Sequence, residues 1–367
     1  MKFISGMILI DAPHSALNML GNDSNSAEDN KTIVKKLKCG REKYAYVSGQ
    51  AWRYWWRQTL RDMFNWELSP LEKVKGKNQV YTQANPIKYP DDDVFGYMRA
   101  LEGQTVTRVS PLKNTPLISI LPEYNSITDD FASASRHEGD PVIYEQEFYS
   151  TILKGAFSLD LESLGRFSFA NKTGFKNLIN PDELGAGKKT KSKPKKDAKL
   201  EKLKEIFEEE YVKIAKEKNV EMNDNEWVMS KEERYKRAVD ALNALKCMYG
   251  GAKQTTLLTD ITPKLIIIGL FDGGINPFIT DIIRNEKGYV IFDKESFVGR
   301  VNEFSDILNP KKMFIGVDSG FSKKWNINFD HIEVNDEVEL IIDSIGATLE
   351  NVAKEIANYY GVEDDSK

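Results

Sequence analysis

The sequence predicts an α+β fold, and two observations carry this prediction. Short apolar runs typical of strands are spread along the chain, and between them lie segments whose apolar residues recur at helical spacing. With 367 residues, 41% of them hydrophobic, the chain can bury a large core in one domain or two. No stretch approaches the roughly 18 to 20 apolar residues of a membrane span, and the N-terminus lacks a signal-peptide pattern.

The first elements are expected before residue 65. Residues 3–12 read as a buried strand, 14–40 as a polar loop ending in lysines, and Tyr44–Val47 as a short strand. Ser48 is a typical N-cap for a helix that runs to about Phe64. This helix carries apolar residues at i, i+3, i+4 and i+7, which predicts one buried face.

The middle of the chain is predicted to be rich in strands. Residues 65–104 look irregular, and strands are expected over 105–121, 142–153 and 156–169, with a polar stretch over 122–141. The Gly-, Lys- and Pro-rich segment 185–199 is typical of a mobile linker, and a charged amphipathic helix is expected after it, from Leu200 to Ile214.

The C-terminal part begins with a capping box. Ser230 and Glu233 predict the start of a helix that ends at Gly250–Gly251. Leu265–Leu270 is fully apolar and reads as a central strand, followed by strands near 289–292 and 312–317 and a helix from Thr348 to Tyr360. Without insertions, the order strand, helix, strand, strand, helix, strand is that of a ferredoxin-like, or RRM-type, fold.

Charge is unevenly distributed, which matters more for partners than the net charge of −5. Residues 31–61 hold nine Lys or Arg and one Glu, and residues 188–204 hold nine Lys and two acids. The segment 327–367 holds eleven acids and two Lys, and it could face a basic patch on a neighbouring copy. A polyanion binder needs a local basic surface, although a charge run can also be a solvated face.

The helix after Ser48 offers the clearest binding pattern. Arg53, Arg57 and Arg61 are spaced i, i+4, i+8 and should form one stripe, which a phosphate backbone would neutralise. Ser48, Gly49 and Gln50 place free N–H groups at the positive end of the helix dipole. The alternative is a solvent-facing arginine stripe over a tryptophan core.

Other candidate groups are weaker. The loop Gly250–Thr255 could cradle a phosphate with Lys253 and Gln254, or could be a C-cap and turn; it is not a Walker A loop. Asp91, Asp92 and Asp93 are expected to cap or solvate a loop rather than to bind a metal. Three scattered histidines and two cysteines indicate no metal site, triad or disulfide framework, and we expect a reducing cytoplasm.

Several motifs in order resemble a known family. They are Phe3–Ile10, Val47-Ser48-Gly49-Gln50-Ala51-x-Arg53, Asp92-Asp93-x-Phe95-Gly96-Tyr97-Met98, Ser110-Pro111-Leu112, Glu147-Phe148-Tyr149, Phe157–Leu161 with Gly165-Arg166-Phe167, and Gly250-Gly251-Ala252. Together they resemble the DevR-type backbone protein of type I-B CRISPR Cascade complexes, in the Cas-seven group of the RAMP superfamily. The resemblance covers about residues 3–270; residues 171–229 and those after 272 match poorly.

This resemblance implies a hand-shaped RNA-binding subunit without catalytic activity or cofactor, serving antiviral defence. Its partners would be CRISPR RNA, target DNA through guide pairing, copies of itself in a helical filament, and other Cascade subunits. The implied divisions are palm (1–64, 105–147 with the thumb, 148–170, 230–272), fingers (65–104), an insertion (171–229) and a C-terminal extension (273–367). An aromatic RRM platform is not evident on Phe3–Ile10.

The residues expected to contact RNA on this basis are Lys35, Lys36, Lys38, Ser48, Gln50, Arg53, Arg57, Arg108, Lys113, Arg136, His137, Arg166, Lys253 and Gln254. Two alternatives stay open. One is an endoribonuclease of the same superfamily, with Asp129 or Asp130, or His14 or His137, as the catalytic group. The other is a protein-assembly module that makes no RNA contact.

Overall fold

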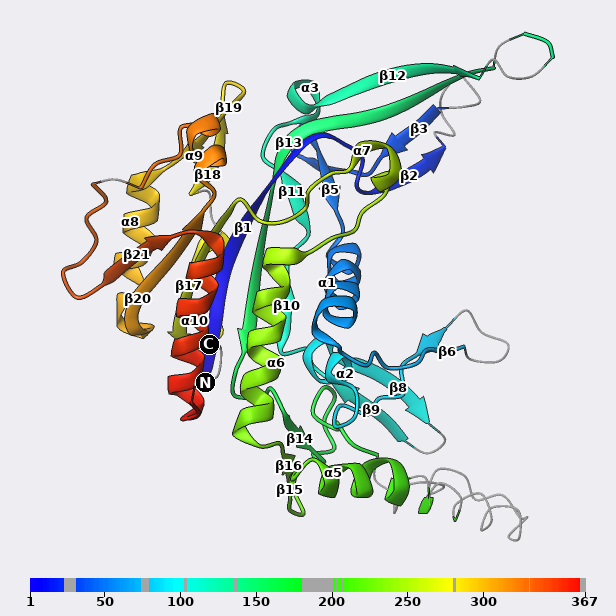
Figure 1. Ribbon diagram of the computed structural model, residues 1–367, viewed down its shortest axis with the longest axis vertical. Coiled ribbons are helices and arrows are strands. Elements are labelled where there is room, and N and C mark those ends of the chain that lie inside the picture. Colours follow the sequence, from blue (N-terminus) through cyan, green and yellow to red (C-terminus); the bar gives the residue numbers. More distant parts are fainter. Residues whose placement is uncertain are drawn as a thin grey trace.

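The fold is mixed α+β, built on one large mixed sheet (Figure 1). The computed structural model describes residues 1–22, 31–73, 79–101, 104–134, 138–140, 142–179, 201, 204–205, 207–279, 282–329 and 331–363. The main path of the sheet is β21-β20-β17-β1-β13-β11-β5-β4. The predicted Lys-rich linker 185–199 lies outside the described residues, as do Arg136 and His137.

The longest strands form the centre of this sheet. β1 (Lys2–Ser15) lies between β13 (Val142–Asp160) and β17 (Leu265–Asp272), antiparallel to both. β10 (Leu112–Asn114) and β11 (Leu117–Ser119) pair with the other side of β13. The predicted strands at 3–12 and 265–270 are confirmed. The two strands expected over 142–169 are one strand to Asp160, because Gly155 and Ala156 continue the ladder opposite β1.

A two-stranded arm projects from the body at one end of β13 (Figure 1). There β13 pairs with β12 (Ile127–Ala134), which follows the short helix α3 (Glu123–Ser126). The base of the arm carries β2 (Met19–Asn22) and β3 (Lys31–Val34), and β4 (Lys36–Cys39) pairs with β5 (Glu42–Val47). The expected loop over 14–40 is therefore wrong for β2, β3 and β4, which pair as β2–β3, β3–β13 and β4–β5.

Three helices cover one face of the sheet. α1 (Gly49–Phe64), α6 (Lys231–Asn243) and α10 (Ile345–Tyr360) bury this helix-side core, which includes Ile4, Ile8, Trp52, Trp56 and Leu349. The predicted N-caps are confirmed, since the Ser48 and Ser230 hydroxyls accept from Ala51 N and Glu233 N. Gly361 ends α10 in the left-handed region at φ 66°. α6 ends at Asn243 and a 3-10 turn follows, Ala244–Cys247, so the helix is shorter than predicted.

The C-terminal elements cover part of the opposite face. The covering elements are β18 (Ile283–Glu286), β19 (Tyr289–Phe292), α8 (Lys294–Glu303) and α9 (Ser319–Trp325), with 3-10 turns Pro277–Ile279 and Ser305–Ile307, whereas β20 (Leu308–Val317) and β21 (Glu339–Asp343) extend the sheet itself. Their second core takes the alternate residues of the same central strands, such as Met7 and Leu9. The predicted strands near 289–292 and 312–317 are confirmed.

A smaller region packs beside α1 and the N-terminal end of α6 (Figure 1). It contains β6 (Glu72–Lys73), β7 (Val80–Tyr81), α2 (Pro90–Phe95), β8 (Tyr97–Leu101), β9 (Gln104–Arg108), β14 (Arg166–Ser168), a π-helix (Glu208–Lys213), α5 (Ile214–Glu217), β15 (Glu221–Met222) and β16 (Glu226–Val228). Residues 65–104 are therefore less irregular than predicted. Among the described residues, no helix is long and apolar enough to span a membrane.

Candidate nucleic-acid interface

The start of α1 is an exposed, capped helix end. The Ser48 hydroxyl takes the Ala51 N–H at 3.3 Å. The N–H groups of Gly49 and Gln50 belong to the first helical turn and so have no intrahelical acceptor, and the Gln50 side chain is exposed. This end therefore has the donors that an anion would need.

The glycine loop lies against α1, which the sequence did not establish. A Cβ on Gly250 would lie 2.6 Å from Cδ1 of Trp55, and one on Gly251 would lie 2.5 Å from a Leu17 methyl. Both glycines have positive φ, so close packing and backbone conformation together require them. Lys253 is exposed, with φ 58°, in the αL position before the short helix α7 (Gln254–Leu257).

Gln254 has an internal role instead of a surface one. Its amide donates to the carbonyls of Gly250 and Thr259, the latter at 3.2 Å. Of the two residues predicted on this loop, the structure thus presents Lys253 to solvent and uses Gln254 to hold the loop in shape.

Arg53 is bound to the protein itself. Nη1 donates to the Leu112 carbonyl (2.8 Å) and Asn114 Oδ1 (3.0 Å), and Nη2 donates to the Phe95 carbonyl (2.7 Å) and the Ser110 hydroxyl (2.8 Å). Burial lowers the pKa of Arg53 to about 10, and the charge of Arg57 adds to this. These contacts fix β10 and the end of α2 to α1.

Arg57, one turn further on, is placed differently. Its Cζ lies 4.2 Å from the centroid of the Phe95 ring, yet the guanidinium makes no hydrogen bond or ion pair within the described part of the chain. Burial lowers its pKa, and the nearby carboxylates of Asp91 and Asp92 raise it. A stacked, half-buried guanidinium with its donors still available suits an incoming phosphate.

Arg61, the third arginine of the row, has a third kind of surrounding. It is exposed and pairs with its neighbour Asp62 at 2.6 Å. The three arginines therefore do not form a uniform stripe. Neither the predicted row of phosphate contacts nor a solvent-facing stripe describes them: one is internal, one is stacked with available donors, and one is paired at the surface.

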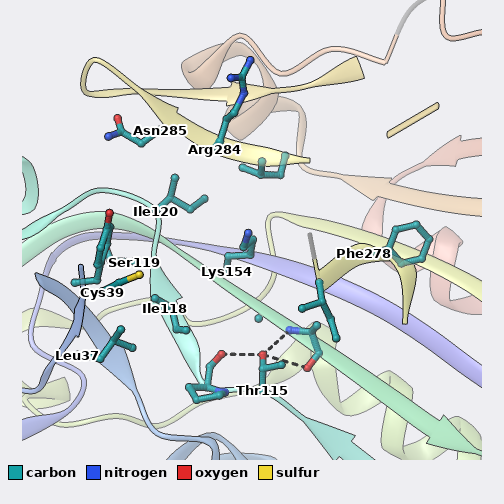
Figure 2. A pocket seen from close by; sticks show the side chains of 16 residues that line it. Leu37, Cys39, Thr115, Ile118, Ser119, Ile120, Lys154, Phe278, Arg284 and Asn285 are labelled. Atoms are coloured by element: carbon teal, nitrogen blue, oxygen red, sulfur yellow. Dashed lines mark hydrogen bonds between the residues drawn. The ribbon is translucent and has the colours of Figure 1, made fainter. Parts of the chain in front are cut away.

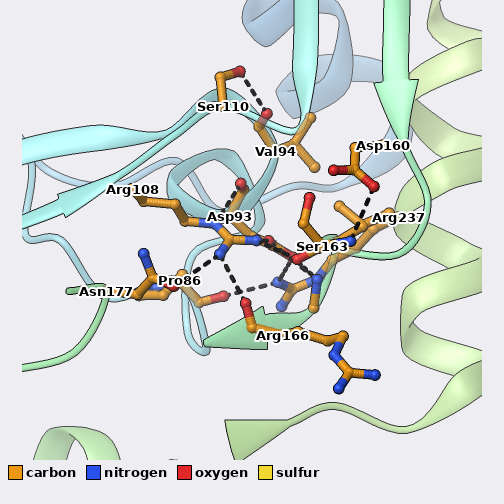
Figure 3. A network of polar contacts seen from close by, with 12 residues as sticks. Pro86, Asp93, Val94, Arg108, Ser110, Asp160, Ser163, Arg166, Asn177 and Arg237 are labelled. Carbon is orange, nitrogen blue, oxygen red and sulfur yellow. Dashed lines mark hydrogen bonds and ion pairs between the residues drawn. The ribbon is translucent and has the colours of Figure 1, made fainter. Parts of the chain in front are cut away.

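Arg108 belongs to a buried network rather than to a surface (Figure 3). Its guanidinium pairs with Asp93, which also pairs with Arg237 at 2.7 Å, and it donates to the carbonyls of Arg166 and Ser163. The Arg108 and Asp93 side chains are 3% and 0% exposed, so Arg108 has no surface to offer RNA. Arg166 pairs with Glu226 at 2.6 Å.

Asp91, Asp92 and Asp93 were expected to cap or solvate a loop. Solvation is wrong, whereas Asp91 and Asp92 do cap backbone N–H groups of loop residues. All three are buried in α2, where Asp91 accepts from Ser69 N and Asp92 from Asn85 N, each at 2.9 Å. Burial and the neighbouring Asp92 raise the pKa of Asp91 to about 6. Among the described residues, no group of His, Cys, Asp and Glu is arranged to hold a metal ion.

The upstream lysines are spread over several surfaces. Lys36 bonds the carboxylates of Glu123 (2.6 Å) and Glu147 (2.7 Å), Lys38 is exposed on β4, and Lys35 lies half-buried between β3 and β4. On the arm, Asp129 lies 3.4 Å from Lys31 and Asp130 is exposed. His14 stacks on Phe148 at the base of the arm, with ring centroids 4.7 Å apart.

The sequence reasoning missed a groove on the sheet face that the helices leave open (Figure 2). Its volume is about 480 Å³, Lys154 of β13 lies at its centre, and Leu37 and Arg284 stand on opposite sides. Lys113, on the same face, is exposed and lies over the Phe3 ring at 5.1 Å. The available signal was the alternation of Lys154, Ala156 and Ser158 with the apolar Leu153, Phe157 and Leu159, which indicates an uncovered face.

Comparison with known proteins gave two kinds of match. The model of the family described as CRISPR-associated negative auto-regulator DevR/Csa2 matches residues 4–293. A chain of a solved "CRISPR RNA-guided surveillance complex, pre-nicking" superimposes with a TM-score of 0.55 at 12% identity, covering 96% of this chain and 100% of that one. A chain of a "CRISPR RNA-guided surveillance complex" gives 0.49 at 11% identity, covering 96% and 99%. A search of curated proteins found no match.

Proposed function

The chain belongs to the CRISPR-associated DevR/Csa2 family, and we propose that it is a non-catalytic subunit that binds CRISPR RNA in a type I-B surveillance complex of the Cascade kind. In this proposal, copies assemble along the spacer of the guide and support its pairing with target DNA. The protein grips backbone and shape, while base pairing reads the sequence.

The observation that carries the proposal is Arg57 in its setting. It lies over Phe95 without a hydrogen-bond acceptor in the described residues, on the helix whose first N–H groups, at Gly49 and Gln50, have no intrahelical acceptor. Lys253 is exposed on the glycine loop that packs on this helix. Arginine donors, helix-start N–H groups and a lysine are the groups that contact nucleic-acid phosphates.

The order of the central strands supports an RRM-type palm. β17, β1, β13 and β10/β11 are neighbours in that order and all antiparallel, and α1 and α6 lie on one face, as in a ferredoxin-like sheet. In this assignment the β6–β9 region is the fingers and the β12–β13 arm is the thumb. We also propose that the complex is of type I-B, that the copies form a filament and that the protein is cytoplasmic.

Binding of a labelled guide-length RNA tests this function. We expect tight binding at low salt that weakens steeply as salt rises, because phosphate contacts release counterions. Replacing Arg57 and Lys253 together by Ala should weaken binding by at least about tenfold, whereas Arg61→Ala should change it little. The proposal fails if the purified protein binds no RNA at low salt.

The same assay separates the nuclease alternative. A subunit without catalytic activity leaves the guide and a complementary RNA intact over hours, with or without Mg²⁺. Specific cleavage that is lost in Asp129→Ala or Asp130→Ala would instead establish the endoribonuclease. Self-assembly without any RNA affinity would establish the protein-assembly module.

A further inference from the structure

The large sheet has two different ends, each bordered by a strand with a free edge. In the described part of the chain, β21 pairs only with β20, and β4 pairs only with β5. A free edge presents unpaired N–H and C=O groups to another strand. A strand of another chain can therefore pair with either edge.

The edge at β4 is basic. Lys38 lies directly opposite Lys43 in the β4–β5 ladder, both are exposed, and Arg41 is exposed in the turn between them. Like charges directly opposite each other destabilise a strand pair. Within the described residues, Lys38 has no ion pair, and the acid nearest Lys43 is Glu123 at 3.6 Å.

The edge at β21 is acidic. Glu339 and Asp343 are exposed at its two ends, and Glu337 is exposed just before it. Lys312 is the cross-strand partner of Glu339, but its ammonium bonds Glu355 at 2.9 Å. Neither Glu339 nor Asp343 forms an ion pair with any described residue. The carboxylates of Glu339 and Asp343 are thus available to form ion pairs with a partner.

The faces of the two edges also match. On β21, Ile341 packs against the helix-side core, so Glu339 and Asp343 lie on that face. Leu340 packs against the core on the opposite face. Ile342 lies on the same face as Leu340 and is 45% exposed.

On β4, Lys36 lies opposite Ala45 of the helix-side core, so Lys38 shares that face. Leu37 and Cys39 point to the open groove on the other face.

We propose that β21 of one copy pairs with β4 of a second copy, so that one sheet continues from copy to copy. Acids then meet lysines on the helix side, and Ile342 meets Leu37 and the groove on the other side. Because the two edges differ, the contact is head-to-tail and can repeat along a filament instead of closing a two-fold dimer. The inference rests on the proposed function, and names the surface through which its copies join.

Charge exchange between the edges tests this contact. Glu339→Lys with Asp343→Lys, or Arg41→Glu with Lys43→Glu, should each raise the protein concentration needed for half-assembly on a guide-length RNA by about tenfold. A chain carrying all four changes should assemble like wild type, because the charges are complementary again. Glu295→Lys with Glu350→Lys, two exposed acids on α8 and α10, adds the same charge elsewhere and should leave assembly unchanged. Sedimentation velocity measures the size of the complexes.

A face-selective cross-link gives an independent readout. Cys39 is exposed on β4, and Cys247→Ser removes the other cysteine. A cysteine at Leu340 or Ile342 should form a disulfide with Cys39 of a second copy, because these positions share its face. A cysteine at Asp343, on the opposite face, should not.

Affinity for an RNA long enough for one copy separates this inference from the proposed function. Glu339→Lys with Asp343→Lys should match the Glu295 and Glu350 control in that affinity while failing to assemble. If wild type binds no RNA, the proposed function fails. If RNA is bound but the four-change chain does not recover assembly and no cross-link forms, the edge contact is overturned.

Discussion

The guanidinium of Arg57 lies over the ring of Phe95, with Cζ 4.2 Å from the ring centroid. This contact joins α1 to the end of α2 and holds a cation beside the buried carboxylates of Asp91 and Asp92. The arginine is thus ordered by the protein while its donors stay available. Such pre-organisation lowers the entropy lost when a phosphate binds.

Arg57→Ala should weaken RNA binding about tenfold and reduce the slope of log affinity against log salt by about 1, because one phosphate contact is lost. The free energy of unfolding should change by only about 1 kcal/mol, the usual size of a cation–π contact. Fluorescence anisotropy over a salt series measures the first effect, and urea unfolding the second. Arg61→Ala is the matched control one turn along the helix.

Arg53→Ala should act mainly on stability. It removes four hydrogen bonds to Phe95, Ser110, Leu112 and Asn114, which leaves buried acceptors without donors, at a cost of about 2 to 4 kcal/mol. Chemical denaturation with near-UV circular dichroism follows the loss. A variant of unchanged stability that has lost RNA affinity would instead place Arg53 on the RNA.

Asp93→Asn should be the most destabilising of the conservative changes, by about 3 to 5 kcal/mol. Asp93 is fully buried between Arg108 and Arg237, and its neutralisation leaves the buried Arg108 guanidinium without its counterion and Arg237 with Glu233 alone. Glu226→Gln removes the partner of the half-exposed Arg166 and should cost less than about 1 kcal/mol. Equal losses of stability in the two variants would contradict the network in Figure 3.

Asp91→Asn should stabilise the protein at neutral pH. Burial and Asp92 raise the pKa of Asp91 from its ordinary value of 3.8 to about 6. The folded state thus holds a proton that the unfolded chain has released, so stability falls as pH rises from about 4 to about 6 and stays lower above that. The Asn amide oxygen can still accept from Ser69 N.

The gain in unfolding free energy at pH 7 should approach about 3 kcal/mol and vanish near pH 4. Unfolding curves of both proteins at five pH values give the difference directly. A difference that is independent of pH would show that Asp91 is not the titrating group.

Gly250→Ala should destabilise the corner between the glycine loop and α1. Its φ of 142° is rarely adopted by other residues, and a Cβ would lie 2.6 Å from Trp55. We expect lower thermal stability and weaker RNA binding, because Lys253 is displaced with the loop. Gly299→Ala, where a Cβ meets nothing within 4 Å, is the control and should be neutral or stabilising.

Local patterns predicted the helices around Ser48 and Ser230 and the central strands, because capping and periodicity act over a few residues. The same patterns missed β2, β3, β4 and the strands over 72–101. Those strands are short, and their pairing partners supply most of the stabilisation. Arg108 and Asp93 looked like surface groups because sequence spacing does not show that distant segments bury them together.

Sequence patterns alone established the α+β class, the caps of the main helices and the family resemblance, since each depends on neighbouring residues or on ordered motifs. They also located α1 as the helix to examine for phosphate contacts. Which arginine keeps its donors available depends on the fold, because the surroundings of Arg53, Arg57 and Arg61 come from other segments of the chain. The two sheet edges follow the same rule. The sequence gives the charge of each edge residue, but the fold decides whether a residue of opposite charge lies close enough to neutralise it.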